Sequence, residues 1–85
     1  MALVSLHYWA GARAAAGTGS ETVEAGTVRE ALQLVRDRRA DPHYTRVVAA
    51  SSLLIDGRRA HEVDLDRPLD DEIRVEVLPP FAGGA

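Results

Sequence analysis

The segment TVREALQLVRDRR, residues 27–39, contains the clearest helix pattern in the chain. Thr27 and Glu30 have the spacing of a capping box, in which each side chain accepts a hydrogen bond from a backbone N–H at the helix start. Three arginines lie in the last turns, where positive charge suits the helix dipole. Pro42 predicts the end of the helix, because the residue before a proline resists α geometry. One apolar stripe, with i, i+3, i+4, i+7 spacing, consists of Val28, Ala31, Leu32 and Val35.

Two alternating segments, one near each end of the chain, predict half-buried strands that this helix can cover. In ALVSLHYW (residues 2–9) and in IRVEVL (residues 73–78), apolar side chains fall on one face and polar side chains on the other. The shorter segment SETVEA (residues 20–25) predicts a third strand. The apolar faces of the two long strands consist of Val4, Leu6 and Tyr8, and of Ile73, Val75 and Val77.

The connecting segments carry turn residues. AGARAAAGTG (residues 10–19) allows only a short helical turn over residues 12–16, because three glycines interrupt it. Asp56-Gly57, between LLI and RRA, predicts a tight β-hairpin. Residues 61–72 are polar and rich in turn residues, and we expect their apolar anchors to be Val63, Leu65 and Leu69.

The expected order is therefore strand, strand, helix, strand, short strand, strand. The simplest packing that buries these apolar faces is a single mixed sheet with one main helix across one face, an α+β arrangement. This is the layout of the β-grasp, or ubiquitin-like, fold. We expect one domain over residues 1–85 with a flexible C-terminal tail over residues 79–85, because a chain this short does not divide into two cores.

Composition excludes several classes of function. The chain has no cysteine, which excludes disulfides, thiolate metal sites and a cysteine nucleophile. Its net charge of −3 argues against nucleic acid as the main partner. No apolar run approaches the roughly 20 residues of a membrane span, and no basic segment precedes an N-terminal apolar run as in a signal peptide. We therefore expect a cytoplasmic protein with no membrane or nucleic-acid partner.

No residue pattern predicts a catalytic or metal site. His7, His43 and His61 are too scattered to hold a metal ion, and no serine lies in a Gly-x-Ser-x-Gly elbow. The glycine-containing loops lack the Lys-Ser/Thr of a phosphate loop. An acidic cluster within residues 64–72 has two interpretations: a solvated turn, or a patch that steers a basic partner.

The segment PPFAGGA, residues 79–85, is the strongest candidate for function, although a frayed terminus is the ordinary alternative. Pro79 and Pro80 favour a stiff, extended stalk, and Phe81 with Ala82 offers an apolar docking element. Gly83 and Gly84 have no Cβ, so their backbone fits a channel too narrow for other residues. Fully extended, residues 79–84 reach about 20 Å, enough to enter the active site of a partner. A carboxylate at such a tip can attack the α-phosphate of ATP and form an acyl-adenylate.

The chain resembles the MoaD/ThiS family of sulfur-carrier proteins, which are bacterial β-grasp proteins, over essentially its whole length. The most specific element is a final strand followed by Pro-Pro, two residues and Gly-Gly, as in RPLDDEIRVEVLPPFAGG (residues 67–84). HYWAGARAAAG contains the family's Ala-Arg pair as Ala12 and Arg13. TVREALQLV and IDGRRA are similar to its helix start and its hairpin. Ala85 departs from the pattern, because working carriers of the family end in the second glycine.

The resemblance implies a carrier that is not itself an enzyme and binds no cofactor. Gly84 would become a thiocarboxylate after adenylation by an ATP- and magnesium-dependent activating enzyme, and would deliver sulfur to a synthase. Molybdenum cofactor biosynthesis is the first choice of pathway, followed by cysteine or natural-product sulfur. Ala85 would first be removed, as a zinc-dependent peptidase does in some relatives, and Arg13 would contact a partner. The alternative is a ubiquitin-like interaction module or protein modifier that carries no sulfur.

Overall fold

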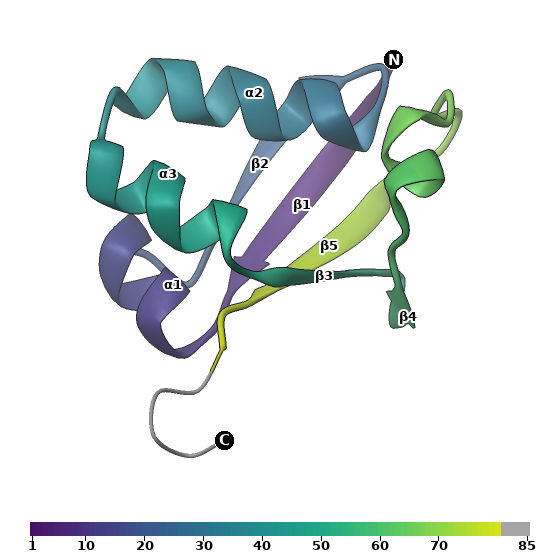
Figure 1. Cartoon of the computed structure of the whole chain (residues 1–85). Helices are drawn as coiled ribbons and strands as arrows, with labels where there is room; N and C mark the ends of the chain where they lie inside the picture. The colour runs from purple at the N-terminus through teal and green to yellow at the C-terminus, as the bar shows by residue number, and fades with distance from the viewer. Residues whose placement is uncertain (81–85) are drawn as a thin grey trace.

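The computed structural model describes residues 1–80, which form a five-stranded mixed sheet with three helices and one 3₁₀ turn (Figure 1). The strand order is β2-β1-β5-β3-β4, in which β1 and β5 are parallel and the other neighbours are antiparallel. This arrangement confirms the predicted β-grasp fold. The elements are β1 (Ala2–Tyr8), α1 (Ala10–Ala16), β2 (Ser20–Ala25), α2 (Val28–Arg39), α3 (Pro42–Ala49), β3 (Ser52–Ile55), β4 (Arg58–Arg59), η1 (Glu62–Asp66) and β5 (Ile73–Leu78).

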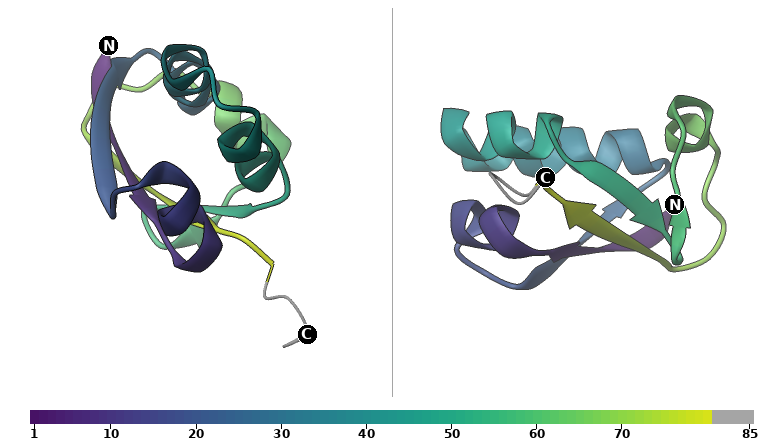
Figure 2. Two further views of the ribbon diagram at one scale, coloured as in Figure 1. Left: turned by 90° about the vertical axis from the view of Figure 1, so that its left-hand side faces the viewer. Right: turned by 60° about the horizontal axis from the view of Figure 1, so that its bottom comes forward.

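The helices and the sheet enclose one apolar core. Figure 2 shows α2 and α3 on one face of the curved sheet, with α1 at the end where β1 finishes. The sheet contributes the predicted alternating residues, and α2 contributes the predicted stripe, of which Leu32 is only partly buried. None of the helices in residues 1–80 is long and apolar enough to cross a membrane. Fully buried side chains include Val4, Leu6, Val28, Val35, Tyr44, Val75 and Val77.

The start of α2 differs in one detail from the predicted capping box. Thr27 Oγ1 accepts a hydrogen bond from the backbone N–H of Glu30 at 3.0 Å, as predicted. Glu30 Oε1 accepts from the N–H of Gly26 at 2.8 Å, one residue earlier than the Thr27 N–H of a standard box. The Glu30 N–H is still capped by Thr27, so the helix begins where the sequence predicted.

The helix α3 is absent from the sequence-based prediction, which treated Pro42 only as the end of the preceding helix. Asp41 caps α3, because its side chain accepts from the N–H groups of His43 (2.9 Å) and Tyr44 (3.4 Å). Pro42 occupies the first turn, where its fixed φ is already helical and no N–H is needed. Tyr44 is buried and Val48 is packed against the core, so this short helix also covers the sheet.

The connections agree with the turn predictions except at one anchor. The helix α1 is slightly longer than the predicted turn and ends at Gly17, which has a left-handed φ of 73°. The hairpin turn has the expected left-handed residues, Asp56 (φ 49°) and Gly57 (φ 84°). Leu65 and Leu69 pack against the core as predicted. Val63 was wrongly predicted as an anchor: it is 64% exposed, because the 3₁₀ turn η1 directs it outward.

A polar network crosses the core next to the end of β1. Tyr8 donates to the Glu21 carboxylate (2.8 Å), so Tyr44, whose hydroxyl lies 2.7 Å from that of Tyr8, must donate to Tyr8. Arg39 pairs with Glu21, donates to the carbonyl of Ala16 (2.8 Å) and stacks 4.7 Å from the centre of the Tyr44 ring. Burial, followed by the bonds to Tyr44 and Glu21, raises the pKa of Tyr8 far above its usual value. The network therefore joins β1, β2, α2 and α3.

Replacing Ala40 with glycine is expected to stabilise the protein. Ala40 ends α2 in the left-handed conformation (φ 50°, ψ 42°), which costs a residue with a Cβ roughly 1–2 kcal/mol. Because glycine also gains more freedom in the unfolded chain, we expect a net gain of about 0.5–1 kcal/mol for Ala40→Gly. Chemical denaturation measures it. Ala50→Gly is the control, since Ala50 caps α3 with an ordinary right-handed φ of −85° and should lose stability.

Candidate functional site

The point where the C-terminal segment leaves the sheet is clamped at the junction of β1, α1 and β5. The N–H of Trp9 donates to the carbonyl of Val77 at 3.2 Å, which ties the end of β1 to the end of β5. Pro79 is buried, and its Cγ would lie 4.0 Å from a Cβ placed on Gly11, in the first turn of α1. Pro79 therefore belongs to the body of the domain, and Pro80 is the first exposed residue of the segment.

The predicted tail residues Phe81, Ala82, Gly83, Gly84 and Ala85 lie outside the described residues. The structure nonetheless gives their point of departure. In Figure 1 the chain leaves β5 beside α1, at the same end of the sheet as the end of β1. The clamp therefore fixes the position of Pro79, from which the C-terminal segment continues.

An exposed tryptophan stands beside this exit, and the sequence analysis did not single it out. Trp9 is 47% exposed, and its Nε1 donates to Glu76 Oε1 at 3.2 Å. Glu76 also lies 3.8 Å from the guanidinium of Arg74, so the same carboxylate contacts both side chains. A tryptophan directly after an alternating strand was the available signal, because tryptophan is enriched at protein interfaces.

The open face of the sheet continues from Trp9 as a row of paired residues. His7 on β1 pairs with Glu76 on β5, and Glu76 pairs with Leu54 on β3. Ser5 Oγ and His7 Nε2 are 2.8 Å apart, so these neighbours on β1 satisfy each other. The face is thus a mixed polar and apolar surface, with no helix over it in Figure 2.

Arg13 lies on α1, but the structure does not place it beside Pro79. Residues two apart on a helix lie about 200° apart, so Gly11 and Arg13 occupy nearly opposite sides of α1. The Arg13 guanidinium carbon would lie 3.6 Å from a Cβ placed on Gly19, over the loop that follows α1. Arg13 is exposed there and lines a shallow depression with Gly17, Thr18 and Gly19. A partner contact by Arg13 stays a prediction.

Comparison with solved structures identifies the fold of the chain. No family model matches the chain, and no curated protein matches it significantly. Among solved structures, small archaeal modifier protein 1 (SAMP1) from Methanosarcina acetivorans is 26% identical, with a TM-score of 0.79 over 99% of this chain and 98% of that one. A protein assigned as molybdopterin converting factor subunit 1 from Pyrococcus furiosus is 25% identical, with a TM-score of 0.74 over 95% and 100%.

A third match is a complex of subunits 1 and 2 of molybdopterin-converting factor from Helicobacter pylori. It is 15% identical, with a TM-score of 0.68 over 96% of this chain and 99% of the matched chain, and supports the fold alone. All three matches cover nearly the full length of both chains, so the likeness includes the whole domain. The chain has the MoaD/ThiS-like β-grasp fold that SAMP1 and molybdopterin converting factor subunit 1 share.

Proposed function

We propose that this chain is a sulfur carrier whose Gly84 carboxylate is activated by a partner enzyme. The observation that carries the proposal is the near-full-length likeness to a converting-factor subunit and to SAMP1, combined with Gly83-Gly84 a few residues beyond a clamped exit. The chain provides an acyl group and no catalytic residues. The partner supplies the ATP site, the magnesium ion and the stabilisation of charge in the transition state. We expect this to occur in the cytoplasm.

The proposed chemistry has two steps. A carboxylate oxygen of Gly84 attacks the α-phosphorus of ATP, which forms the acyl-adenylate and releases pyrophosphate. A sulfur donor at the oxidation level of sulfide then attacks the acyl carbon, AMP leaves, and the product is a thiocarboxylate. Gly84 must be terminal for the first step, so any residue after it, here Ala85, is removed first by a peptidase. The thiocarboxylate then delivers its sulfur to a synthase, with molybdopterin formation as the first choice.

A second candidate function is a ubiquitin-like modifier. The likeness to SAMP1, which is described as a small archaeal modifier protein, favours it. The same acyl-adenylate would then be attacked by the amine of a lysine on another protein, which gives an amide in place of a thiocarboxylate. Both functions use the same tip and differ only in the nucleophile that displaces AMP.

Co-expression with candidate activating enzymes, followed by intact mass spectrometry, tests both functions. The carrier function predicts loss of one alanine and exchange of one oxygen for sulfur. The modifier function predicts conjugates on other proteins and no exchange. A chain that keeps its full mass and forms no conjugate with every activating enzyme and peptidase tried would overturn both.

Replacing Trp9 with alanine is expected to weaken docking of the activating enzyme or synthase by about 10–30-fold, because exposed aromatic residues dominate interface energy. Trp9 lies beside the tail exit, and its side chain makes one exposed hydrogen bond to the rest of residues 1–80, so thermal stability should hardly change. Leu34→Ala is the matched control, since Leu34 is similarly exposed (44%) but lies on α2. Equal losses for both variants would contradict a docking role for Trp9.

A further inference from the structure

A groove on the helical side of the molecule is separate from the open face of the sheet. Its volume is 490 Å³, within the range of 300–1,000 Å³ typical of ligand sites. One wall consists of α2 and α3, and the other of β3, residues 59–62 and η1. One lining residue, Ser52, is the strand partner of Leu78, the residue before Pro79.

The floor of the groove is apolar. Four of the lining side chains are only partly buried and rest on the core. They come from α2, α3, β3 and η1 and are Leu32, Val48, Leu53 and Leu65. Burying their remaining surface under a ligand would contribute favourable free energy at about 25 cal/mol per Å². The floor therefore favours a ligand with at least one apolar side chain.

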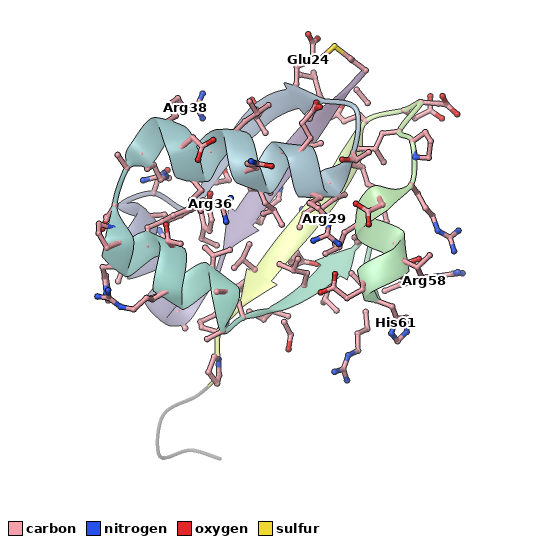
Figure 3. All side chains as sticks on the ribbon, turned by 45° about the horizontal axis from the view of Figure 1, so that its top comes forward. Glu24, Arg29, Arg36, Arg38, Arg58 and His61 are labelled. Atoms are coloured by element: carbon pink, nitrogen blue, oxygen red, sulfur yellow. The ribbon has the colours of Figure 1, made fainter. Side chains whose placement is uncertain are left out.

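The walls of the groove carry excess positive charge, although the whole chain has a net charge of −3. Among residues 1–80, the one acidic residue that lines it is Glu62, which pairs with Arg29 at 2.7 Å. Asp66 also pairs with Arg29 at 2.7 Å. The positive charge of Arg29 is therefore neutralised by these carboxylates. Figure 3 shows Arg29 and Arg36 extending from α2 on this side, with His61 at the β4 end.

Arg36 and Arg59 are the two lining arginines that have no strong counter-ion in the described part of the chain. The only ion pair of Arg36 among residues 1–80 is with its neighbour Asp37, at 4.0 Å, the limit of such a contact. Arg59 is exposed and makes no ion pair within the described part of the chain. Because they lie on opposite walls, they can contact acidic groups on both sides of an apolar anchor.

We propose that this groove binds an extended acidic peptide segment of a partner protein, with an apolar side chain on the floor and carboxylates against Arg36 and Arg59. Charge complementarity selects an acidic chain, and the apolar floor between the two arginines favours a peptide over a compact anion. Gln33 and Thr45 line the same groove and offer hydrogen bonds to the peptide backbone. A partner that receives the tail could place such a segment here, but the binding itself does not depend on any chemistry of Gly84.

Fluorescence anisotropy with the full-length protein tests the proposal. The probe is a fluorescein-labelled seven-residue peptide with two leucines flanked by glutamates, and its counterpart carries lysines in place of the glutamates. We expect saturable binding of the acidic probe alone, with affinity that falls as salt rises. The double variant Arg36→Glu/Arg59→Glu should bind it at least about 10-fold more weakly, since charge-pair contacts at interfaces contribute that much.

The control is Arg58→Glu, because Arg58 is the exposed neighbour of Arg59 on β4 and does not line the groove. It should keep the affinity within about two-fold, as expected for a charge at the rim. The lysine probe should bind the double variant, because charge reversal on both sides restores the pairing. No saturable binding of the acidic probe, an equal loss in Arg58→Glu, or displacement of the probe by equimolar inorganic phosphate would each overturn the proposal.

Discussion

A chain that ends at Gly84 is expected to form a thiocarboxylate without any peptidase, whereas the chain that retains Ala85 is expected to need one. The reason is chemical: the α-phosphorus of ATP must be attacked by the carboxylate of Gly84, which is an amide as long as Ala85 is attached. Deleting Ala85 from the gene therefore makes its removal by a peptidase unnecessary. Intact mass after incubation with an activating enzyme, ATP, magnesium and a sulfur donor measures the product.

Gly84→Val in the shortened chain is the matched variant. The added side chain both crowds the partner's channel and displaces the reacting carboxylate, and a displacement of 1 Å can cost about 100-fold in rate. We expect at least that loss of adenylation, with unchanged stability, since the position lies beyond the clamp at Pro79. Thiocarboxylate on a chain that still carries Ala85, or normal adenylation of the valine variant, would contradict the proposed role of Gly84.

The parts of the fold that were predictable are those whose pattern is local. The alternation in β1 and β5 and the stripe on α2 depend on residues two to four positions apart, so the sequence displays them directly. The sequence does not predict α3 because Asp41-Pro42 is compatible with two structures. One is the end of α2, and the other is an N-cap followed by a first-turn proline at the start of a new helix. The helical i, i+4 spacing of Tyr44 and Val48 is the signal in the sequence that favours a second helix.

The candidate sites were less predictable because they depend on segments far apart in the chain. The burial of Pro79 requires that Gly11, 68 residues earlier, lies at the end of β5, which only the parallel pairing of β1 with β5 provides. The groove needs α2, α3 and residues 59–65 to meet around one hollow. Periodicity within a single segment predicts neither the contact of Pro79 with α1 nor the groove. The composition of the tail, by contrast, is visible in the sequence because it depends only on neighbouring residues.

Replacing Glu21 with alanine is expected to destabilise the protein by about 2–4 kcal/mol, a large share of the roughly 4–13 kcal/mol typical of an 85-residue domain. Glu21 accepts from Tyr8 and pairs with both Arg38 (3.1 Å) and Arg39. Its loss leaves the largely buried Arg39 guanidinium without its counter-ion and the Tyr8 hydroxyl without its acceptor, and both are costly. The midpoint of thermal unfolding should fall by about 10–30 °C.

The matched control is Glu24→Ala, since Glu24 is an exposed residue of the same strand, β2, and should change the stability by less than about 0.5 kcal/mol. If both variants lost the same stability, the contacts of Glu21 with Tyr8 and Arg39 would contribute nothing more than any glutamate on β2 does.

The pH dependence of Glu21→Gln separates the charge of Glu21 from its packing. Burial raises the pKa of Glu21, but hydrogen bonds from Arg39 and Tyr8 and the charges of Arg39 and Arg38 outweigh burial, so the net pKa lies below its ordinary 4.5.

A carboxylate with a lowered folded-state pKa stabilises the protein above the unfolded-state pKa, and this stabilisation is lost as the pH falls through the folded-state pKa. The difference in unfolding free energy between wild type and Glu21→Gln should therefore be constant near neutral pH and shrink below pH 4.5. A difference that stays constant on acidification would mean that the ionisation of Glu21 does not contribute to stability, and that its charge does not stabilise the junction of β2 with α2 through Arg39.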